Sequence, residues 1–478
     1  MLCQMKGAVK HMIAQQIYSE VIKSYEAALD DTCRAENGVF YTDIVLAEKI
    51  ITNLNIPKDA TILDPCCGVG SFLYAANKKH CLNIYGADCD EKAINICSQY
   101  IPNAKLITID SIGSPANLLI EKLNYNKKFD YVVGNPPYAP LSSKVEINSD
   151  DIMFINKVNA YGKNLFVAAL IRALELVKEN GIVSYIIPKN FLHVATYSRF
   201  RKELLNNKTI ISIVDLGRCF KKVRGEQIVL TLKNCRPTNN SMINFQKYEN
   251  GNFISLPVEI PQKFFNDEIL LFTCENDYKI YKKLTSAYQT LNDHKGGYVG
   301  RGKSKSEKAI SGKDIRKFGY KNMNLPKEGS QIFIQNIYST ESGIIAAFGG
   351  NLEASETVTI FTDGDEKMCR YILGILHSRL ANFFLYKYCY NNSRLTMHTD
   401  SKYLKKIPLP NFDQNTFNEI LMIVSLLETE EYMSKTWFDY LEKLNISVYK
   451  AYGIDAELSQ YIDSEMRTIQ SKRWLSND

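Results

Sequence analysis

The stretch TILDPCCGVGSF, residues 61–72, joins a short apolar strand pattern to a glycine-rich turn and the start of a helical pattern. Asp64 stands at the end of the strand pattern, and Gly68 and Gly70 follow in the turn. A glycine-rich turn between a strand and a helix lets the backbone approach a bound nucleotide closely. The segment lacks the GxGxxG of nicotinamide sites and is not followed by the Gly-Lys-Ser/Thr of a P-loop, so neither of those sites is indicated.

Strand and helix patterns keep alternating over about residues 58–240. Helical stretches such as 164–178 and 196–206 separate short runs rich in β-branched residues, which are TILD, NIYGAD, LITID, YVVGN, IVSYIIP, IISIVDLG and QIVLTL. This alternation predicts an α/β domain with a mostly parallel sheet. An amphipathic pattern over residues 8–30 predicts a helix that packs on this domain.

Two further strand patterns also end in a carboxylate. NIYGAD ends at Asp88, and LITID ends at Asp110. Open α/β sheets bind ligands at the carboxyl ends of their strands, and a carboxylate after the second strand is placed to hold a ribose diol. Together with Asp64, these strand ends indicate a site for a ligand that contains a nucleoside.

The segment Asn135-Pro136-Pro137-Tyr138 follows the strand pattern DYVVG. Two prolines make a rigid, extended loop that lacks two N–H donors. The Asn135 amide, the Pro136 carbonyl and the Tyr138 ring remain available. Two hydrogen-bond acceptors beside an aromatic face predict a receptor for a planar group that bears an NH2.

The composition excludes several classes of protein. The chain has 478 residues, 45% of them hydrophobic, and a net charge of +6. No apolar run approaches the roughly 18–20 residues that span a bilayer, and the first residues lack the basic and apolar parts of a secretory signal. None of the 12 cysteines forms a CxxC pair, so the chain predicts no metal site and a reduced, cytoplasmic protein.

The second half of the chain has a different pattern. After a plausible linker at 235–241, residues 242–410 read as irregular, with short strands and turns. Residues 295–321 hold nine lysines and arginines against Glu307 and Asp314, which predicts either phosphate contacts or a solvated surface loop. Residues 412–478 read as helices and hold six lysines and arginines against twelve acidic residues, so this tail is expected to lie away from phosphates and to brace the domain before it.

In their order, these motifs resemble S-adenosylmethionine-dependent adenine-N6 DNA methyltransferases of the gamma arrangement. In that family the cofactor motifs come first, the NPPY motif next and a target recognition domain last. GVFYT at 38–42 resembles the N-terminal cofactor motif, and NLF at 164–166 and CFKK at 219–222 resemble motifs that follow NPPY. The resemblance covers about 38–235 and departs from the family at Asp43, where a proline is usual, and at Phe166, where a tyrosine is frequent.

The resemblance implies a domain organisation. It places an N-terminal helix at 1–37 and a Rossmann-like, seven-stranded methyltransferase domain at 38–240. An α+β target recognition domain would follow at 241–478 and end in the helical tail.

The resemblance also implies roles for single residues. Asp88 would accept the ribose hydroxyls of S-adenosyl-L-methionine, Asp110 would accept its adenine amino group, and Asp64 with Thr42 would hold its methionine end. The cofactor set that we expect is Tyr41, Thr42, Asp64, Cys66, Gly68, Gly70, Asp88, Cys89, Asp110, Ser111, Asn135, Pro137 and Phe166. The expected catalytic set is Asn135, Pro136, Pro137 and Tyr138. Tyr138 and Phe220 would stack on the target base, and the DNA phosphates would meet Lys295, Arg301, Lys303, Lys305, Lys313, Arg316 and Lys317.

The implied reaction is methyl transfer to N6 of an adenine that is flipped out of double-stranded DNA, in a restriction–modification or epigenetic system. An RNA or protein-glutamine N-methyltransferase with the same NPPY chemistry is the alternative. We expect no endonuclease domain, no membrane partner, and a monomer in the prokaryotic cytoplasm, associated with the nucleoid, with a separate restriction endonuclease as a possible partner. The polar segment 139–163 is expected to be mobile without DNA and to close over the substrate.

Overall fold

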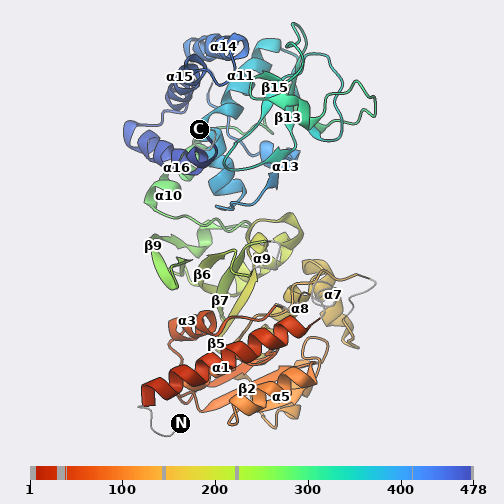
Figure 1. Cartoon of the computed structure of the whole chain (residues 1–478), viewed down its shortest axis with the longest axis vertical. Coiled ribbons are helices and arrows are strands. Elements are labelled where there is room, and N and C mark those ends of the chain that lie inside the picture. Colours follow the sequence, from red (N-terminus) through yellow and green to blue (C-terminus); the bar gives the residue numbers. More distant parts are fainter. Residues whose placement is uncertain are drawn as a thin grey trace. The chain divides into compact units, whose positions relative to one another are not determined.

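The computed structural model describes residues 7–29, 38, 40–142, 147–220, 225–411 and 413–474. The chain divides into two compact units, Met1–Ile269 and Leu270–Asp478, which we call unit 1 and unit 2. Figure 1 labels their helices and strands. No helix in the described part of the chain is both long and apolar enough to cross a membrane.

Unit 1 is built on a nine-stranded sheet of order β3-β2-β1-β4-β5-β7-β6-β8-β9. Its strands are β1 (Thr61–Asp64), β2 (Asn83–Asp88), β3 (Lys105–Thr108), β4 (Phe129–Gly134), β5 (Val177–Pro188), β6 (Thr209–Gly217), β7 (Gln227–Lys233), β8 (Met242–Glu249) and β9 (Asn252–Pro261). Strands β1 to β5 run parallel to one another, whereas β7 runs antiparallel to both β5 and β6. The parallel strands therefore end at one edge, where the acidic residues of the sequence motifs lie.

The helices of unit 1 are α1 (Gly7–Ala28), α3 (Ile44–Asn53), α4 (Ser71–Lys78), α5 (Glu91–Tyr100), α6 (Ala116–Lys122), α7 (Ile152–Tyr161), α8 (Leu165–Leu176) and α9 (Ser198–Asn207). Polar side chains cap the N-termini of several of these helices. Asp90 caps α5 by accepting hydrogen bonds from two backbone N–H groups of its first turn, and Asn164 caps α8 through the N–H of Phe166. Helix α8 is buried over most of its length, because nearly all of its residues are apolar.

Unit 2 combines a four-stranded antiparallel sheet with helices. The sheet has the order β10-β16-β13-β15, with β10 (Tyr298–Arg301), β16 (Val358–Thr362), β13 (Gln331–Gln335) and β15 (Ala346–Phe348). Two small pairs join β11 (Ile315–Arg316) to β12 (Gly319–Tyr320) and β14 (Ile337–Tyr338) to β17 (Met397–His398).

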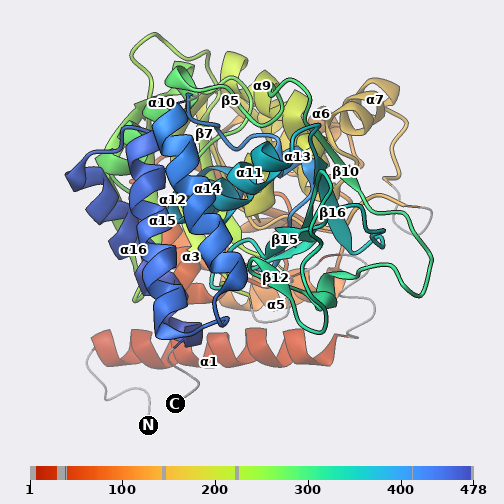
Figure 2. The same cartoon turned by 90° about the horizontal axis from the view of Figure 1, so that it is seen from above.

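The helices of unit 2 are α10 (Glu275–Ala287), α11 (Glu366–His377), α12 (Arg379–Phe384), the π-helix η6 (Leu385–Cys389), α13 (Ser401–Leu404), α14 (Gln414–Thr429), α15 (Lys435–Ala451) and α16 (Ala456–Trp474). Figure 2 shows α14, α15 and α16 on the side of this unit away from its sheet. Buried Lys387 lies 3.3 Å from Asp277 of α10 and 2.9 Å from Glu465 of α16, so this ion-pair network ties the last helix to the rest of unit 2.

The α/β prediction for unit 1 is confirmed, with one correction. The first seven strands of the order form the expected sheet, but β8 pairs in parallel with β6, and β9 pairs with β8. The sheet therefore has nine strands instead of seven, and unit 1 extends to Ile269, beyond the predicted boundary at 240. Sequence patterns did not reveal this, because β8 joins the sheet through β6, which is not its neighbour in the chain, and β9 follows only as the hairpin partner of β8.

The secondary-structure predictions were best where the patterns were long. The predicted helices at 8–30, 164–178 and 196–206 correspond to α1, α8 and α9, and the helical tail corresponds to α14, α15 and α16. The irregular reading of 242–410 was wrong, because this range contains helices α10, α11 and α12 as well as strands. The predicted loop at 139–163 contains α7, which buries Phe154 and Val158; residues 143–146 lie outside the described residues.

Candidate active site

Asp64 is the last residue of β1, directly before the glycine-rich turn. Its side chain is only 2% exposed and accepts a hydrogen bond from the Cys66 N–H at 3.1 Å. Burial raises the pKa of Asp64, and the charge of Asp88 adds to this shift. A cationic ligand group would therefore stabilise this carboxylate.

The two glycines of the turn are required by its geometry. Gly68 and Gly70 have φ angles of +51° and +95°, in the left-handed region. A Cβ at Gly68 would lie 2.6 Å from a ring carbon of Tyr41, and a Cβ at Gly70 would lie 2.4 Å from the sulfur of Cys97. The turn thus packs tightly on its neighbours and leaves no space for larger residues.

Asp88 is oriented by two backbone donors at the end of β2. The Gly68 N–H donates to its Oδ2 at 2.7 Å, and the Asp90 N–H donates to its Oδ1 at 3.0 Å. Burial raises the pKa of Asp88 although both hydrogen bonds act in the opposite direction. The carboxylate is therefore held in one orientation and keeps further lone pairs for a ligand.

The turn after β3 holds the third carboxylate. Asp110 is exposed, and its Oδ1 accepts hydrogen bonds from the N–H groups of Ile112 at 3.1 Å and Gly113 at 2.9 Å. The adjacent Ser111 is buried and donates its hydroxyl to the carbonyl of Pro65. This bond joins the turn after β3 to the turn after β1, so the predicted cofactor motifs meet at one edge of the sheet.

The NPPY loop follows β4, which lies beside β1 in parallel. The Asn135 Nδ2 donates to the Phe40 carbonyl at 2.9 Å, and its Oδ1 accepts the Tyr138 hydroxyl. The backbone of Tyr138 is held on both sides, because its N–H donates to the Gly38 carbonyl at 3.1 Å and its carbonyl accepts from Asn164 Nδ2 at 2.9 Å. The loop is therefore anchored to the N-terminal motif and to the cap of α8.

Three half-buried aromatic rings lie together at this loop. The ring centroid of Phe40 is 6.0 Å from that of Tyr138 and 6.4 Å from that of Phe220. The sequence motifs indicate stacking roles for Tyr138 and Phe220 but none for Phe40. Its place in GVFYT, next to the expected cofactor residues Tyr41 and Thr42, was the only sequence signal for it.

The expected cofactor residues Phe166, Cys66 and Cys89 differ in their surroundings. The Phe166 ring is fully buried and makes edge contacts with the rings of Phe191 and Tyr197, so it forms part of the core of unit 1. We therefore do not assign it to the cofactor. Cys89 is exposed next to Asp88, whereas Cys66 is buried more deeply and lies 3.8 Å from the Ser111 hydroxyl.

The residues at this edge fit S-adenosylmethionine. Thr42 Oγ1 is buried and has no hydrogen-bond partner within the described part of the chain. A spare buried hydroxyl and a buried carboxylate at Asp64 suit an amino-acid moiety, and the carboxylates of Asp88 and Asp110 suit a ribose diol and an amino group. Within the described ranges, no three His, Cys, Asp or Glu side chains are grouped so that they could hold a metal ion.

The predicted DNA-binding cations of unit 2 differ in exposure. Lys295, Arg301, Lys303, Lys305 and Lys313 are exposed. Arg316 is half-buried, with its guanidinium 5.0 Å from the ring centroid of Tyr432. Lys317 is only 7% exposed, and burial lowers its pKa to about 8, so it does not present its ammonium group at the surface as the prediction required.

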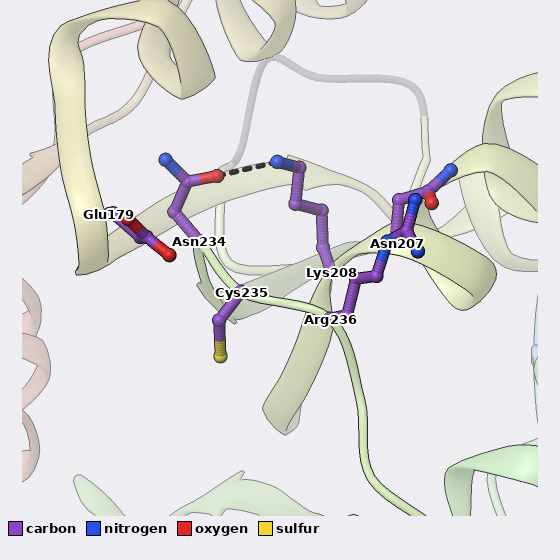
Figure 3. Close-up of a pocket in the computed structure, with 6 residues that line it drawn as sticks. All are labelled: Glu179, Asn207, Lys208, Asn234, Cys235 and Arg236. Atoms are coloured by element: carbon purple, nitrogen blue, oxygen red, sulfur yellow. Dashed lines mark hydrogen bonds between the residues drawn. The ribbon is translucent and has the colours of Figure 1, made fainter.

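A separate pocket of about 580 Å³ lies in unit 1. It is lined by Glu179, Asn207, Lys208, Asn234, Cys235 and Arg236. Figure 3 shows the hydrogen bond that Lys208 Nζ donates to Asn234 Oδ1, which measures 2.5 Å. Lys208 precedes β6 and Asn234 follows the antiparallel β7, so the pocket lies at the edge opposite the carboxylates and is not part of the candidate active site.

Residues 103–220, which include Asp110, Ser111 and the NPPY loop, match the family of Eco57I restriction-modification methylases. This segment of unit 1 is therefore similar to restriction-modification methylases. The matched residues begin after the glycine-rich turn. Ser111, which is within the match, donates a hydrogen bond to Pro65 in that turn, so the turn lies beside the matched segment.

Two curated relatives show a similarity of the same kind. The Type II methyltransferase M.VspI of Vibrio sp. (strain 343) is 27% identical over 276 residues, which cover 55% of this chain and 63% of that protein. The modification methylase CviBIII of Paramecium bursaria Chlorella virus NC1A is 26% identical over 193 residues, which cover 39% of this chain and 47% of that protein. The match therefore spans less than two thirds of either relative.

A solved structure is similar over a longer range. It is the structure of the Type IIL restriction-modification enzyme MmeI in complex with DNA, which matches with a TM-score of 0.59 and 12% identity. The match covers 96% of this chain and 81% of that chain. At this level of identity the similarity concerns the fold alone.

Proposed function

We propose that this protein is a site-specific DNA methyltransferase that transfers the methyl group of S-adenosyl-L-methionine to N6 of an adenine flipped out of double-stranded DNA. The observation that carries this proposal is the orientation of Asn135. Its Nδ2 is engaged by the Phe40 carbonyl at 2.9 Å, which leaves Oδ1 as an acceptor directed toward Tyr138.

The Asn135 Oδ1 and the Pro136 carbonyl would bind the two N–H groups of the adenine amine. This amine is a poor nucleophile, because its lone pair is delocalised into the ring. Two acceptors draw the nitrogen toward tetrahedral geometry and stabilise the positive charge that develops on it during attack. The amine would replace the Tyr138 hydroxyl, which occupies Oδ1 in this structure.

The three aromatic rings offset the energy of base flipping. Unstacking and unpairing a base costs a few kcal/mol, and stacking on an aromatic side chain returns about 1–3 kcal/mol per base. The rings of Tyr138 and Phe220 would contact the adenine. The Phe40 ring, which lies next to both, would form the third aromatic surface around the base. Burial raises the pKa of Tyr138, so its hydroxyl stays protonated and does not act as a base.

S-Adenosylmethionine supplies a methyl group on a positively charged sulfur. Asp64 would balance the ammonium and the nearby sulfonium, and Thr42 would donate its spare hydroxyl. Asp88 and Asp110 would bind the ribose and the adenine amino group. The protein's contribution to the transfer is mainly alignment, and the methylated ammonium is acidic enough to lose its proton to water.

Unit 2 would select the DNA sequence. We infer that the exposed cations of residues 295–313 contact phosphates, which would give salt-dependent affinity. We further propose that the protein acts as a monomer in a prokaryotic cytoplasm, beside a separate restriction endonuclease or in an epigenetic role.

The direct test uses S-adenosylmethionine labelled on its methyl group. Label should appear as N6-methyladenine in duplex DNA that was made in a methylation-free host, always within one sequence context. Label in RNA or in protein glutamine would contradict the proposal. A parallel incubation of unmethylated DNA with Mg²⁺ should leave the DNA intact, and fragments of defined length would show that the chain also cleaves.

A further inference from the structure

Helix α1, the long red helix in Figure 1, packs directly on the turn that carries the cofactor motif. Tyr18 is fully buried and donates its hydroxyl to the Val69 carbonyl, between the two glycines of the turn. Its ring stacks on Tyr100 at 4.2 Å between centroids. A Cβ at Gly70 would approach the Tyr18 hydroxyl to 3.2 Å, so the helix and the turn fit closely together.

A second tyrosine lies on the same face of α1. Residues 18, 22 and 25 are spaced by four and three positions, which places them along one side of a helix. The Tyr25 hydroxyl donates to Asp90 Oδ2 at 2.5 Å, and the Tyr25 ring meets Tyr41 edge-on at 5.9 Å. Ile22, between the two tyrosines, is 5% exposed and packs in the same cluster as Val69.

The hydrogen bonds of both tyrosines end on the segments whose N–H groups bind Asp88. Its Oδ2 accepts from the Gly68 N–H, in the turn that Tyr18 holds through Val69. Its Oδ1 accepts from the Asp90 N–H, in the residue whose side chain Tyr25 holds. Each oxygen of this carboxylate is therefore oriented by a donor that a tyrosine of α1 positions.

The hydroxyls of Tyr18 and Tyr25 stay protonated and can therefore donate hydrogen bonds at all times. Burial is the largest cause that raises the pKa of Tyr18, and burial followed by the hydrogen bond to Asp90 raises the pKa of Tyr25. Both groups therefore remain protonated at physiological pH and keep donating to their acceptors.

We propose that α1 is a part of the cofactor subsite, in which Tyr18 and Tyr25 are positioning residues that orient the Asp88 carboxylate toward the ribose diol of the ligand. This inference rests on the proposed function only in taking S-adenosylmethionine and its product as ligands. It assigns to α1 a role in ligand selection, beyond packing on the sheet.

The test measures ligand binding to the full chain by calorimetry, without DNA. The probes are S-adenosylhomocysteine and its 2′-deoxy analogue, and the variants are Tyr18→Phe and Tyr25→Phe. Wild-type protein should prefer the ligand with the complete diol. Each variant should raise the Kd for S-adenosylhomocysteine by about fivefold or more, in line with the loss of one hydrogen bond to a buried partner, and should raise the Kd for the 2′-deoxy analogue by less than about twofold.

Tyr320→Phe is the matched control. This buried tyrosine of unit 2 also donates its hydroxyl to a backbone carbonyl, that of Phe348, at 2.9 Å. It should leave both Kd values unchanged.

Three results would overturn the proposal: no preference for the diol in wild-type protein, no change in either variant, or an equal loss for both ligands. An equal loss would mark α1 as a purely structural support. Because the measurement needs no DNA, it succeeds or fails independently of whether label reaches adenine.

Discussion

Replacement of Asn135 by alanine tests the chemistry most directly. The substitution removes two interactions: the Nδ2 hydrogen bond to the Phe40 carbonyl at 2.9 Å and the Oδ1 acceptor that faces Tyr138. The first is a neutral hydrogen bond that contributes about 1 kcal/mol to the position of the loop. The second is an acceptor aimed at charge that develops in the transition state, and the loss of such a group costs about 2.7–4 kcal/mol.

The sum of about 4–5 kcal/mol corresponds to a fall in kcat of about 10³-fold or more, at about 1.4 kcal/mol per factor of ten. The assay is single-turnover transfer of labelled methyl groups to a duplex that contains the mapped site. Affinity for S-adenosylmethionine should change by less than about threefold, because the cofactor carboxylates remain. Asn135→Asp should also be slow, since its second oxygen would face the Phe40 carbonyl without a hydrogen to donate.

Asn83→Ala is the matched control, because Asn83 also donates its Nδ2 to a backbone carbonyl, that of Asp59, at 2.9 Å. Asn83 stands at the start of β2, at the other end of the strand from Asp88. Its variant should keep wild-type kcat. Retention of more than a tenth of kcat in Asn135→Ala, with unchanged cofactor affinity, would refute the proposed role of the amide.

Three further predictions concern the aromatic, basic and buried residues. Phe220→Ala should weaken binding of the flipped base by about tenfold, since stacking contributes about 1–3 kcal/mol, and 2-aminopurine at the target position should report less flipping. Joint replacement of Arg301, Lys303 and Lys305 by glutamine should lower the slope of log K against log salt by about 0.9 for each phosphate that the variant no longer neutralises, as read from DNA titrations. Lys317→Met should raise the melting temperature near pH 7, because the pKa of buried Lys317 is lowered to about 8 in the folded state. The wild-type protein should gain stability from this group as the pH rises from about 8 toward the unfolded value of about 10.4, and the variant should lack that gain.

The first two of these predictions have matched controls. Phe220→Tyr keeps an aromatic face and should retain flipping. Lys435 and Lys443 are exposed in the helical tail, and their replacement by glutamine should leave the salt slope unchanged. An unaltered salt slope in the triple variant would show that these three residues do not contact DNA phosphates. A lower melting temperature for Lys317→Met at pH 7 would show that the ammonium group stabilises unit 2.

The sequence predicted which motifs meet at one edge of the sheet better than it predicted the boundaries of the fold. The turn at Gly68 and Gly70, the carboxylates at Asp64 and Asp88, and the NPPY loop were all readable, because each is a local pattern in which a strand ends and a polar or rigid residue follows. The addition of β8 and β9 to the sheet was not readable, since the hairpin of these two strands joins the sheet through the pairing of β8 with β6, which is not adjacent in the chain.

The sequence by itself determined the chemical groups that stand at the ends of the parallel strands, because strand, turn and helix preferences act over a few neighbouring residues. Only the tertiary structure decided which distant residues meet those groups. It brought Phe40 to the NPPY loop and buried Lys317 within unit 2. It also joined Tyr18 and Tyr25 of α1 to Val69 and Asp90, in the segments that hold Asp88. The physical reason is that these contacts arise from packing between segments far apart in the chain, and periodicity along the chain cannot specify which buried faces will meet.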